Sequence, residues 1–322
     1  MRIKDEELRI ILYLCSIKIL KDMMKLIADS GSTKTDWTLL HSSVRHNEHV
    51  VIATFHTQGI TPVHQTAGDI RQILTGELLP QLSTFPRSKL IELGLLESPL
   101  LQGMNVYFYG SGCTPDQVPM MSQLITEVFS AKTVEIHSDL TAAARALCQH
   151  EPGIACIIGT GANSCLYDGT QIVQNTPPLG YILGDEGSGA VLGRTFLNAI
   201  FKDPALADVR DEFLKENKMQ LKDVIQRVYR EPMANRWLAS LSPFIHDRLS
   251  HPAIRTLVVD NFRLFLRRNV VPYHRPDLPV GCVGSVACNY QTQLEEAARA
   301  EGFIIGNIMQ SPMEGLLKYH ED

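Results

Sequence analysis

The sequence lacks the features that mark nucleic-acid-binding and membrane-spanning proteins. No run of Lys and Arg is longer than two residues, and 30 basic against 35 acidic residues give a formal net charge of −5. Nucleic-acid binders need clustered Lys and Arg to displace counterions from phosphates, so we expect no nucleic-acid partner. No apolar stretch reaches the roughly 20 residues that span a bilayer, so we expect no membrane partner.

The sequence also lacks any recognisable cysteine framework. None of its 7 cysteines lies in a Cys-x-x-Cys pair or at a zinc spacing with histidine. Disulfide frameworks are typical of short secreted chains, so this usage favours free, mostly buried thiols in a reducing compartment. We therefore expect a cytoplasmic protein.

Residues 1–23 contain an apolar stretch, 10–17, that could be mistaken for a signal peptide. Acidic residues 5–7 precede it, no small-x-small cleavage site follows, and Met23-Met24 offers a second start before a predicted strand. We interpret 1–23 as an N-terminal extension without function, either a short amphipathic helix or sequence upstream of the true start.

The remaining length and its patterning predict an α/β fold of two mixed domains that share one topology. The 322 residues suffice for two cores, and a near-average composition, 44% apolar and 20% charged, excludes fibrous and disordered classes. Each half begins with three strand-like segments and continues with alternating helices and strands, which implies hairpins at one edge and parallel pairing beyond them. The expected strands are 26–28, 37–40, 50–55, 106–109 and 133–136, then 154–158, 164–167, 171–173, 280–283 and 303–305. The expected helices are 62–82, 116–130, several within 187–270, 291–300 and 312–319.

Two glycine-containing turns occupy equivalent places in the two halves. Residues 29–37, Asp-Ser-Gly-Ser-Thr-Lys-Thr-Asp-Trp, join two predicted strands, so they are not a Walker P-loop, which a helix would follow. Residues 159–164, Gly-Thr-Gly-Ala-Asn-Ser, join the first two strands of the second half. Small residues in such hairpins let backbone N–H groups approach an anion, although ordinary β-turns use them too. Asp29, at the end of its strand, is the type of ligand that hydrated Mg²⁺ prefers.

Three further segments combine polar residues with turns. Asp139 follows a predicted strand and begins an Ala-rich helix, which either Ser138 or Asp139 could cap. Alternatively, the Asp139 carboxylate lies at the carboxyl end of a strand, where ligands bind in α/β proteins, and could accept a proton. Residues 180–189 place four glycines around an acidic pair, which indicates a loop lining a polar ligand. Gly284 and Ser285 follow a buried strand and open a helix, where a nucleotide could lie or where simple packing could suffice.

This ordered set of motifs resembles the superfamily of sugar kinases, heat-shock chaperones and actin. Within it the chain is similar to N-acetylglucosamine kinases of the BadF/BadG/BcrA/BcrD ATPase family, which includes activators of 2-hydroxyacyl-CoA dehydratases. The resemblance covers residues from Lys25 to about His320. It implies two duplicated RNase-H-like domains, 24–140 and 141–306, with a cleft between them and the C-terminal helix, 307–322, packed back on the first.

The resemblance also implies the cofactors and the role of each residue. ATP with Mg²⁺ would be the phosphoryl donor and a sugar the acceptor, with Asp29 at the metal and Asp139 as the base for the sugar's 6-hydroxyl. The residues expected to contact ATP are Gly31, Ser32, Thr33, Lys34, Gly159, Thr160, Gly161, Gly284 and Ser285. Those expected to contact the sugar are Thr61, Asn163 and Asp185.

Two departures from the family pattern concern the sugar. The loop after the third strand usually carries an Asn, where this chain has 57–62, Thr-Gln-Gly-Ile-Thr-Pro, so Thr61 or Gln58 would replace it. Some relatives place Gly-Trp before the loop glycine, where this chain has Pro178-Leu179. We expect an amino-sugar kinase, with an iron–sulfur activator ATPase or a non-catalytic sugar-binding protein as alternatives, and a homodimer is possible.

Overall fold

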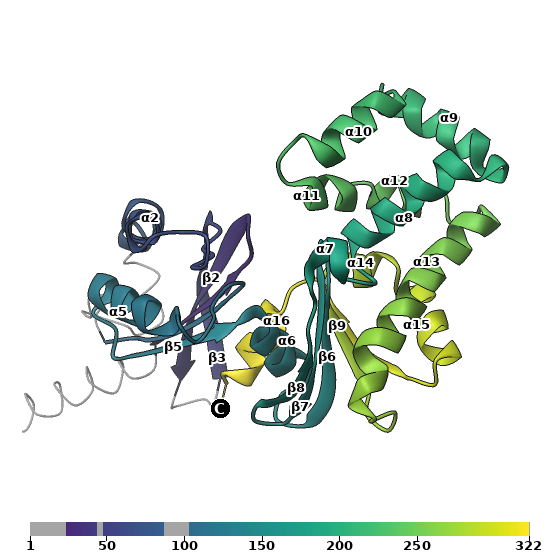
Figure 1. Cartoon of the computed structure of the whole chain (residues 1–322). Helices are drawn as coiled ribbons and strands as arrows, with labels where there is room; N and C mark the ends of the chain where they lie inside the picture. Colours follow the sequence, from purple (N-terminus) through teal and green to yellow (C-terminus); the bar gives the residue numbers. More distant parts are fainter. Residues whose placement is uncertain (1–23, 44–47, 87–102, 322) are drawn as a thin grey trace, which may run out of the picture. The chain divides into compact units, whose positions relative to one another are not determined.

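The computed structural model describes residues 24–43, 48–86 and 103–321, and the extension 1–23 lies outside them (Figure 1). The chain divides into two compact units, and each is described by itself. Unit 1 comprises the residues up to Ala142 together with those from Leu316 onward, and unit 2 comprises Ala143–Gly315. Both boundaries between the units fall inside helices, one in α6 (Asp139–Cys148) and one in α16 (Met313–Tyr319). The boundaries expected from the resemblance were 140/141 and 306/307. Among the described residues, no helix is both long and apolar enough to cross a bilayer.

Unit 1 is built on a five-stranded mixed sheet with the strand order β3-β2-β1-β4-β5. β1 pairs antiparallel with β2 and parallel with β4, and β4 pairs parallel with β5. The strands are β1 (Met24–Ser30), β2 (Lys34–Ser43), β3 (Glu48–Gln58), β4 (Asn105–Gly110) and β5 (Thr133–Ser138). Its helices are α2 (Ala67–Ile73), the π-helix η1 (Leu74–Leu78), α3 (Leu79–Ser83) and α5 (Val118–Phe129).

Unit 2 repeats this sheet with the order β10-β9-β6-β7-β8, which is the order of unit 1 read from its other end. β6 pairs antiparallel with β7 and parallel with β9, as β1 does with β2 and β4. The strands are β6 (Pro152–Ile158), β7 (Ala162–Asp168), β8 (Ile172–Thr176), β9 (Val280–Val283) and β10 (Ile305–Met309). The shared α/β topology predicted from the sequence is therefore confirmed.

The helices of unit 2 lie mostly between β8 and β9 in the sequence. They are α7 (Gly180–Leu183), α8 (Gly189–Lys202), η2 (Pro204–Leu206), α9 (Ala207–Glu216), α10 (Leu221–Tyr229), α11 (Ala234–Ala239), α12 (Ser242–His246), α13 (Pro252–Phe265), η3 (Leu266–Val270) and η4 (Val271–Tyr273). After β9 come α14 (Ser285–Asn289) and α15 (Gln291–Ala300). Figure 1 shows α9, α10 and α11 grouped at one end of this unit, away from β7 and β8.

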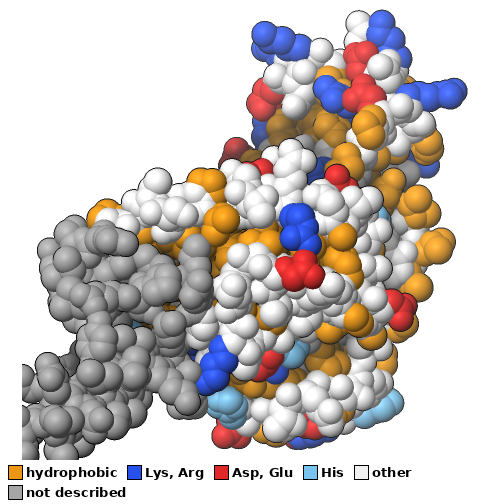
Figure 2. Space-filling view, turned by 90° about the vertical axis from the view of Figure 1, so that its left-hand side faces the viewer, with side chains coloured by type: hydrophobic (Ala, Val, Ile, Leu, Met, Phe, Trp, Pro, Cys, Tyr) orange, Lys and Arg blue, Asp and Glu red, His pale blue; other side chains and the backbone are white. Residues whose placement is uncertain are grey.

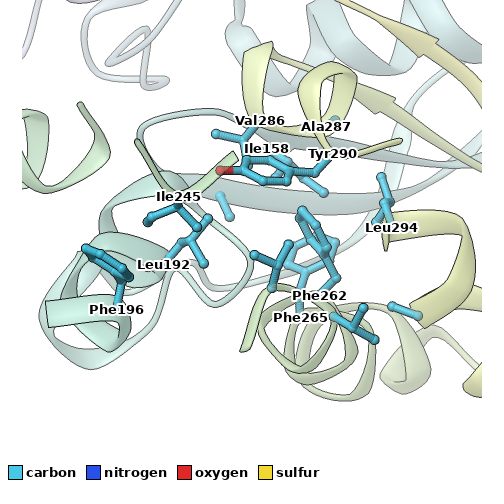
Figure 3. Close-up of a cluster of buried hydrophobic side chains, with 14 of the residues drawn as sticks. Ile158, Leu192, Phe196, Ile245, Phe262, Phe265, Val286, Ala287, Tyr290 and Leu294 are labelled. Atoms are coloured by element: carbon cyan, nitrogen blue, oxygen red, sulfur yellow. The ribbon is translucent and has the colours of Figure 1, made fainter. Parts of the chain in front are cut away.

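Each unit has its own hydrophobic core. In unit 1 the buried face of the sheet contributes Trp37 and Phe108, whose ring centroids lie 5.7 Å apart. In unit 2 Phe262 and Phe265 of α13 lie in the same buried cluster as Ile158 at the end of β6 (Figure 3). This cluster anchors the strand that leads into the second glycine turn.

The strand expected at 303–305 is wrong in position, because helix α15 ends in a glycine motif that uses Phe303. Gly302 has φ +81°, and the Phe303 N–H donates to the Ala298 carbonyl at 2.9 Å. These features define a Schellman motif, which satisfies the last carbonyls of a helix and buries the residue after the glycine. β10 therefore begins only at Ile305.

The close packing of α8 on α11 yields a testable prediction. A Cβ on Gly193 of α8 would lie 2.1 Å from the Leu238 carbonyl oxygen, so Gly193→Ala must push the helices apart. We expect a loss of about 1–3 kcal/mol in the free energy of unfolding, measured by chemical denaturation.

Gly76→Ala is the matched control, because Gly76 is also helical and a Cβ there meets no atom within 4 Å. This variant should gain about 0.5–1 kcal/mol through its helix propensity. Equal stability of the two variants would contradict the packing interpretation.

Candidate functional site

The carboxyl ends of three parallel strands meet at one edge of unit 1. Ser30 of β1 pairs with Gly110 of β4, which in turn pairs with Ser138 of β5. The half-buried Asp29 and Asp139 therefore lie near the ends of β1 and β5, two strands apart. In α/β proteins this edge of the sheet is where ligands bind.

The first glycine turn is an exposed hairpin closed by the Gly31 N–H, which donates to the Lys34 carbonyl at 3.0 Å. Its other side rests on Gly59, whose N–H donates to the Thr33 carbonyl at 3.1 Å. A Cβ on Gly59 would lie 2.4 Å from the Gly31 oxygen, so only glycine permits this approach. No role was predicted for Gly59, whose only signal in the sequence is a glycine shortly after the strand expected at 50–55.

Two side chains of this hairpin are already engaged within the unit. Lys34 Nζ lies 2.8 Å from Asp36 Oδ2, so this cation is held close to the turn. The Ser30 hydroxyl lies 2.6 Å from the Thr35 hydroxyl and donates to the Ile60 carbonyl at 2.9 Å. These contacts fix both ends of the turn and leave Gly31, Ser32 and Thr33 exposed.

Helix α6 is capped by Ser138, so the two alternatives for Asp139 can be separated. The Ser138 hydroxyl accepts the Thr141 N–H at 3.2 Å, whereas Asp139 Oδ1 accepts the N–H of the adjacent Leu140 at 2.8 Å. Burial raises the pKa of Asp139, and the backbone N–H groups offset this only in part. The nearby Cys113 thiol has its pKa raised to about 12 by burial and by the Asp139 charge. Asp139 is therefore a carboxyl group with enhanced basicity.

Of the two residues that could replace the family's Asn, Gln58 is committed elsewhere. Its side-chain amide and its backbone N–H donate to the two carboxylate oxygens of Glu77, at 2.7 and 2.8 Å. Thr61 is held by its N–H, which donates to Gln65 Oε1 at 2.7 Å. Its methyl group packs beside Gly112, in the loop after β4. Thr61 is thus the better-placed candidate.

The second glycine turn lies in unit 2 and is joined to the start of α8. The Gly159 N–H donates to the Gly161 carbonyl at 2.9 Å. The Gly189 and Ala190 N–H groups then donate to the carbonyls of Gly159 and Thr160, at 2.8 and 3.2 Å. These bonds hold the turn against the first residues of the helix.

Gly284 lies directly against this second turn. Its φ is +129°, and a Cβ there would be 2.4 Å from the Ile158 oxygen and 3.3 Å from the Gly159 nitrogen. The structure therefore brings Gly284 and the adjacent Ser285 together with the second turn.

Asp185 belongs to the same cluster and occupies a strained backbone conformation. Its φ is +53°, and a Cβ on Gly161 would lie 3.1 Å from its Oδ2. Burial and the Glu186 charge raise the pKa of Asp185 to about 6, opposed by a hydrogen bond from the Ala162 N–H. Strained non-glycine residues of this kind concentrate at functional sites.

Asn163 follows Ala162 and has its amide oriented by two donors. Its Oδ1 accepts from the Ser164 N–H and from Asn175 Nδ2, both at 2.9 Å. The side-chain oxygen is occupied, which leaves the amide nitrogen to donate to a ligand. Asn175 was not identified from the sequence, because its place close to Asn163 depends on the pairing of β7 with β8, in which Asn175 lies opposite Cys165.

The site residues predicted from the sequence thus form one cluster in each unit. Unit 1 holds Asp29, the first turn, Thr61 and Asp139, and unit 2 holds the second turn, Asn163, Asp185, Gly284 and Ser285. Within the described residues, no three His, Cys, Asp or Glu side chains are grouped as metal ligands. The single carboxylate Asp29 still suits Mg²⁺, which typically takes one or two carboxylates and completes its shell with water and phosphate.

The chain is similar over most of its length to a protein of known structure. A solved structure of a candidate N-acetylglucosamine kinase from Porphyromonas gingivalis is 42% identical, with 92% of this chain and 99% of that chain covered and a TM-score of 0.79. No protein-family model matches the chain, and no curated protein matches it.

Two more distant structures share the fold. A candidate N-acetylglucosamine kinase from Chromobacterium violaceum is 16% identical, with 93% and 99% covered and a TM-score of 0.67. A ROK hexokinase from Thermus thermophilus is 14% identical, with 92% and 97% covered and a TM-score of 0.51. At these identities the likeness concerns the fold alone.

The pKa of Asp185 can be tested without any ligand. We expect its carboxyl carbon, followed by NMR, to titrate near pH 6 rather than near the ordinary 3.8. Glu186→Gln should lower this pKa, because it removes a negative charge that opposes ionisation. Titration near the ordinary value in the unmodified protein would contradict the burial assigned to this carboxyl.

Proposed function

Because the chain belongs to the family of N-acetylglucosamine kinase-like proteins, we propose that it transfers the γ-phosphoryl group of ATP to the 6-hydroxyl of N-acetylglucosamine or a related amino sugar. One structural observation carries the proposal. Glycine turns join the first two strands of both five-stranded sheets, 31–34 in unit 1 and 159–161 in unit 2, and the sheets share one strand order. Such paired turns suit a phosphate chain bound through backbone N–H groups.

We assign the phosphates of ATP to Gly31, Ser32, Thr33 and Lys34 of the first turn and to Gly159, Thr160 and Gly161 of the second. The exposure of residues 31–34 in the first turn, and the open space at the Cβ position of Gly159 in the second, support this assignment. Gly284 and Ser285 would contact the adenosine. Asp29 would hold Mg²⁺, which supplies charge neutralisation to the phosphates when bound.

The sugar is assigned to three polar groups and one base. The Asp185 carboxylate and the Asn163 amide would bind ring hydroxyls, with Thr61 in the position of the family's Asn. Asp139 would accept the proton of the sugar's 6-hydroxyl as the hydroxyl oxygen attacks the γ-phosphorus. The bond between the γ-phosphorus and ADP breaks, and ADP leaves. Phosphoryl transfer depends mainly on positioning and charge stabilisation, so one aligned carboxylate is a sufficient base.

The iron–sulfur alternative gains no support from the thiols. Cluster ligands are cysteine thiolates, whereas Cys113 and Cys156 are buried and no spacing among Cys113, Cys148 and Cys156 demands a cluster. A sugar-binding protein without catalysis is distinguished by the assay below.

The direct test is ADP formation over a panel of hexoses and N-acetylhexosamines. We expect turnover to depend on the sugar, and Asp139→Asn to lower kcat by about 10²–10⁴-fold, since it removes the base but keeps the shape. Glu135→Gln, at an exposed position on β5, the strand that precedes Asp139, should leave kcat unchanged. Sugar-independent turnover would refute the kinase, sugar binding without turnover would favour the binding protein, and full activity of Asp139→Asn would refute the assigned base.

The raised pKa of Asp185 predicts how sugar affinity depends on pH. The ionised carboxylate accepts sugar hydroxyls more strongly than the protonated acid, so affinity is full well above pH 6 and falls as Asp185 is protonated. We expect the sugar Kd, measured by calorimetry, to rise about tenfold per pH unit well below the pKa.

Asp185→Asn provides the control for this profile. It should bind the sugar more weakly at neutral pH and should lose most of the pH dependence between 5 and 7, as expected when a titrating group near 6 is removed. An unchanged pH profile in this variant would assign the titration to another group.

A further inference from the structure

Residues 58–61, which we call the connecting segment, run from the end of β3, the edge strand of the unit 1 sheet, into the loop that follows. The two middle residues of the segment are buried and are bound by the first glycine turn and the strand end before it. The Gly59 N–H donates to the Thr33 carbonyl at 3.1 Å, and the Ile60 N–H donates to the Ser30 hydroxyl at 2.9 Å. The turn that we assign to the phosphates of ATP therefore rests on this segment.

The first and last residues of the connecting segment are bound by side chains that come later in the chain. The Gln58 N–H donates to Glu77 Oε2 at 2.8 Å, and the Gln58 side-chain amide donates to Glu77 Oε1 at 2.7 Å. The Thr61 N–H donates to Gln65 Oε1 at 2.7 Å, and the Gln65 amide donates to the Gly59 carbonyl at 3.0 Å. All four backbone N–H groups of the segment are thus bound, two by the phosphate turn and strand end and two by these side chains.

Glu77 reaches the edge strand from the π-helix η1. The Leu74 carbonyl accepts the N–H of the residue five positions later, which is the pattern of a π turn, and such turns are frequent at functional sites. Leu74 and Leu78 lie in the buried core of unit 1, so this part of the helix is anchored. On the next turn, in α3, the Gln81 amide donates to the His56 carbonyl at 2.8 Å. The helix therefore binds the end of β3 at two backbone groups.

The bonding of Glu77 distinguishes it from other acidic residues of the surface. Acidic side chains are scattered over the described part of the face drawn in Figure 2, so an accessible glutamate alone indicates no role. Glu77 is half-buried, and its two carboxylate oxygens bind a backbone and a side-chain donor of one residue. This arrangement fixes both the position and the rotation of Gln58. Glu127 is a useful comparison, because it is exposed and binds the side chains of Arg71 and Gln123.

We propose that Glu77 is a positioning residue for both substrates in unit 1, an inference that rests on the proposed function. By holding Gln58, Glu77 sets where Gly59 supports the phosphate turn and where Thr61 lies for the sugar. The nucleotide and the sugar therefore depend on one shared support. Asp139 follows β5, at the opposite edge of the sheet from β3, so this support does not hold the base.

The first test needs no ligand. We expect amide hydrogen exchange at residues 58–61, followed by NMR, to be about tenfold faster or more in Glu77→Ala, because local opening of the segment then costs less free energy. Glu127→Ala, which removes an exposed carboxylate from α5, should leave exchange in this segment unchanged. Equal protection of the segment in Glu77→Ala and the unmodified protein would overturn the proposal.

The second test separates binding from chemistry in steady-state kinetics. Glu77→Ala should raise the KM for ATP and the KM for the sugar, each by about five- to tenfold, and change kcat by less than about threefold. Asp139→Asn should show the opposite pattern, with its loss in kcat. A Glu77→Ala variant that lowers kcat alone, or that raises only one of the two KM values, would contradict the shared support.

A rescue experiment tests the bond between Glu77 and Gln58 with side chains of nearly unchanged size. Gln58→Glu should raise both KM values, because it places two carboxylates against each other. Glu77→Gln should remain close to the unmodified protein, since the new amide can accept the backbone N–H and donate to a reoriented Gln58 amide. The double variant should recover the affinity lost in Gln58→Glu, because the new amide then donates to the new carboxylate. A double variant no better than Gln58→Glu would overturn the proposal.

The combined results distinguish this inference from the proposed function. An unmodified protein without sugar-dependent turnover would refute the proposed function, whereas the exchange experiment would still decide whether Glu77 holds the connecting segment. Faster exchange in Glu77→Ala with both KM values unchanged would leave the contact standing and refute the positioning role.

Discussion

Parallel pairing of the middle strands is the constraint on which the candidate site depends. Because β1, β4 and β5 run in one direction, their carboxyl ends lie at one edge, and Asp29 and Asp139 reach that edge although 110 positions separate them in the chain. The antiparallel hairpin between β1 and β2 turns back at the same edge and adds the exposed residues 31–34. A carboxylate at this edge can bind a metal ion or accept a proton. Phosphoryl transfer uses both functions.

Close backbone contact at glycine supports each turn from a distant part of the chain. Gly59 lies against the first turn and Gly284 against the second, and at each a Cβ would come within 2.4 Å of a carbonyl oxygen. Both glycines follow strands, so the sheet itself delivers them to the turn. Unit 2 adds Asp185, whose positive φ is a strained conformation that its surroundings must hold.

Much of this arrangement could be predicted from the sequence, because strand periodicity and turn composition are local signals. The two hairpins and the repeated strand order follow from them, as confirmed by the two sheets. Local signals could not decide whether Ser138 or Asp139 caps α6, since either side chain can do so, and only the folded chain shows the Ser138 bond. They also could not show the roles of Gly59 and Asn175, which depend on pairing between segments far apart in the sequence. The start of β10 was predicted two residues too early, because Phe303 belongs to the motif that ends α15.

The central claim is that Asp139 removes the proton of the hydroxyl that attacks ATP bound at the two glycine turns. A crystal structure with N-acetylglucosamine, Mg²⁺ and a non-hydrolysable ATP analogue tests it most directly. We predict an Asp139 oxygen about 2.6–3.2 Å from the 6-hydroxyl, with that hydroxyl oxygen in line with the γ-phosphorus and the phosphates against both turns. A nucleotide bound away from the turns, or a sugar whose 6-hydroxyl faces another group, would contradict the account.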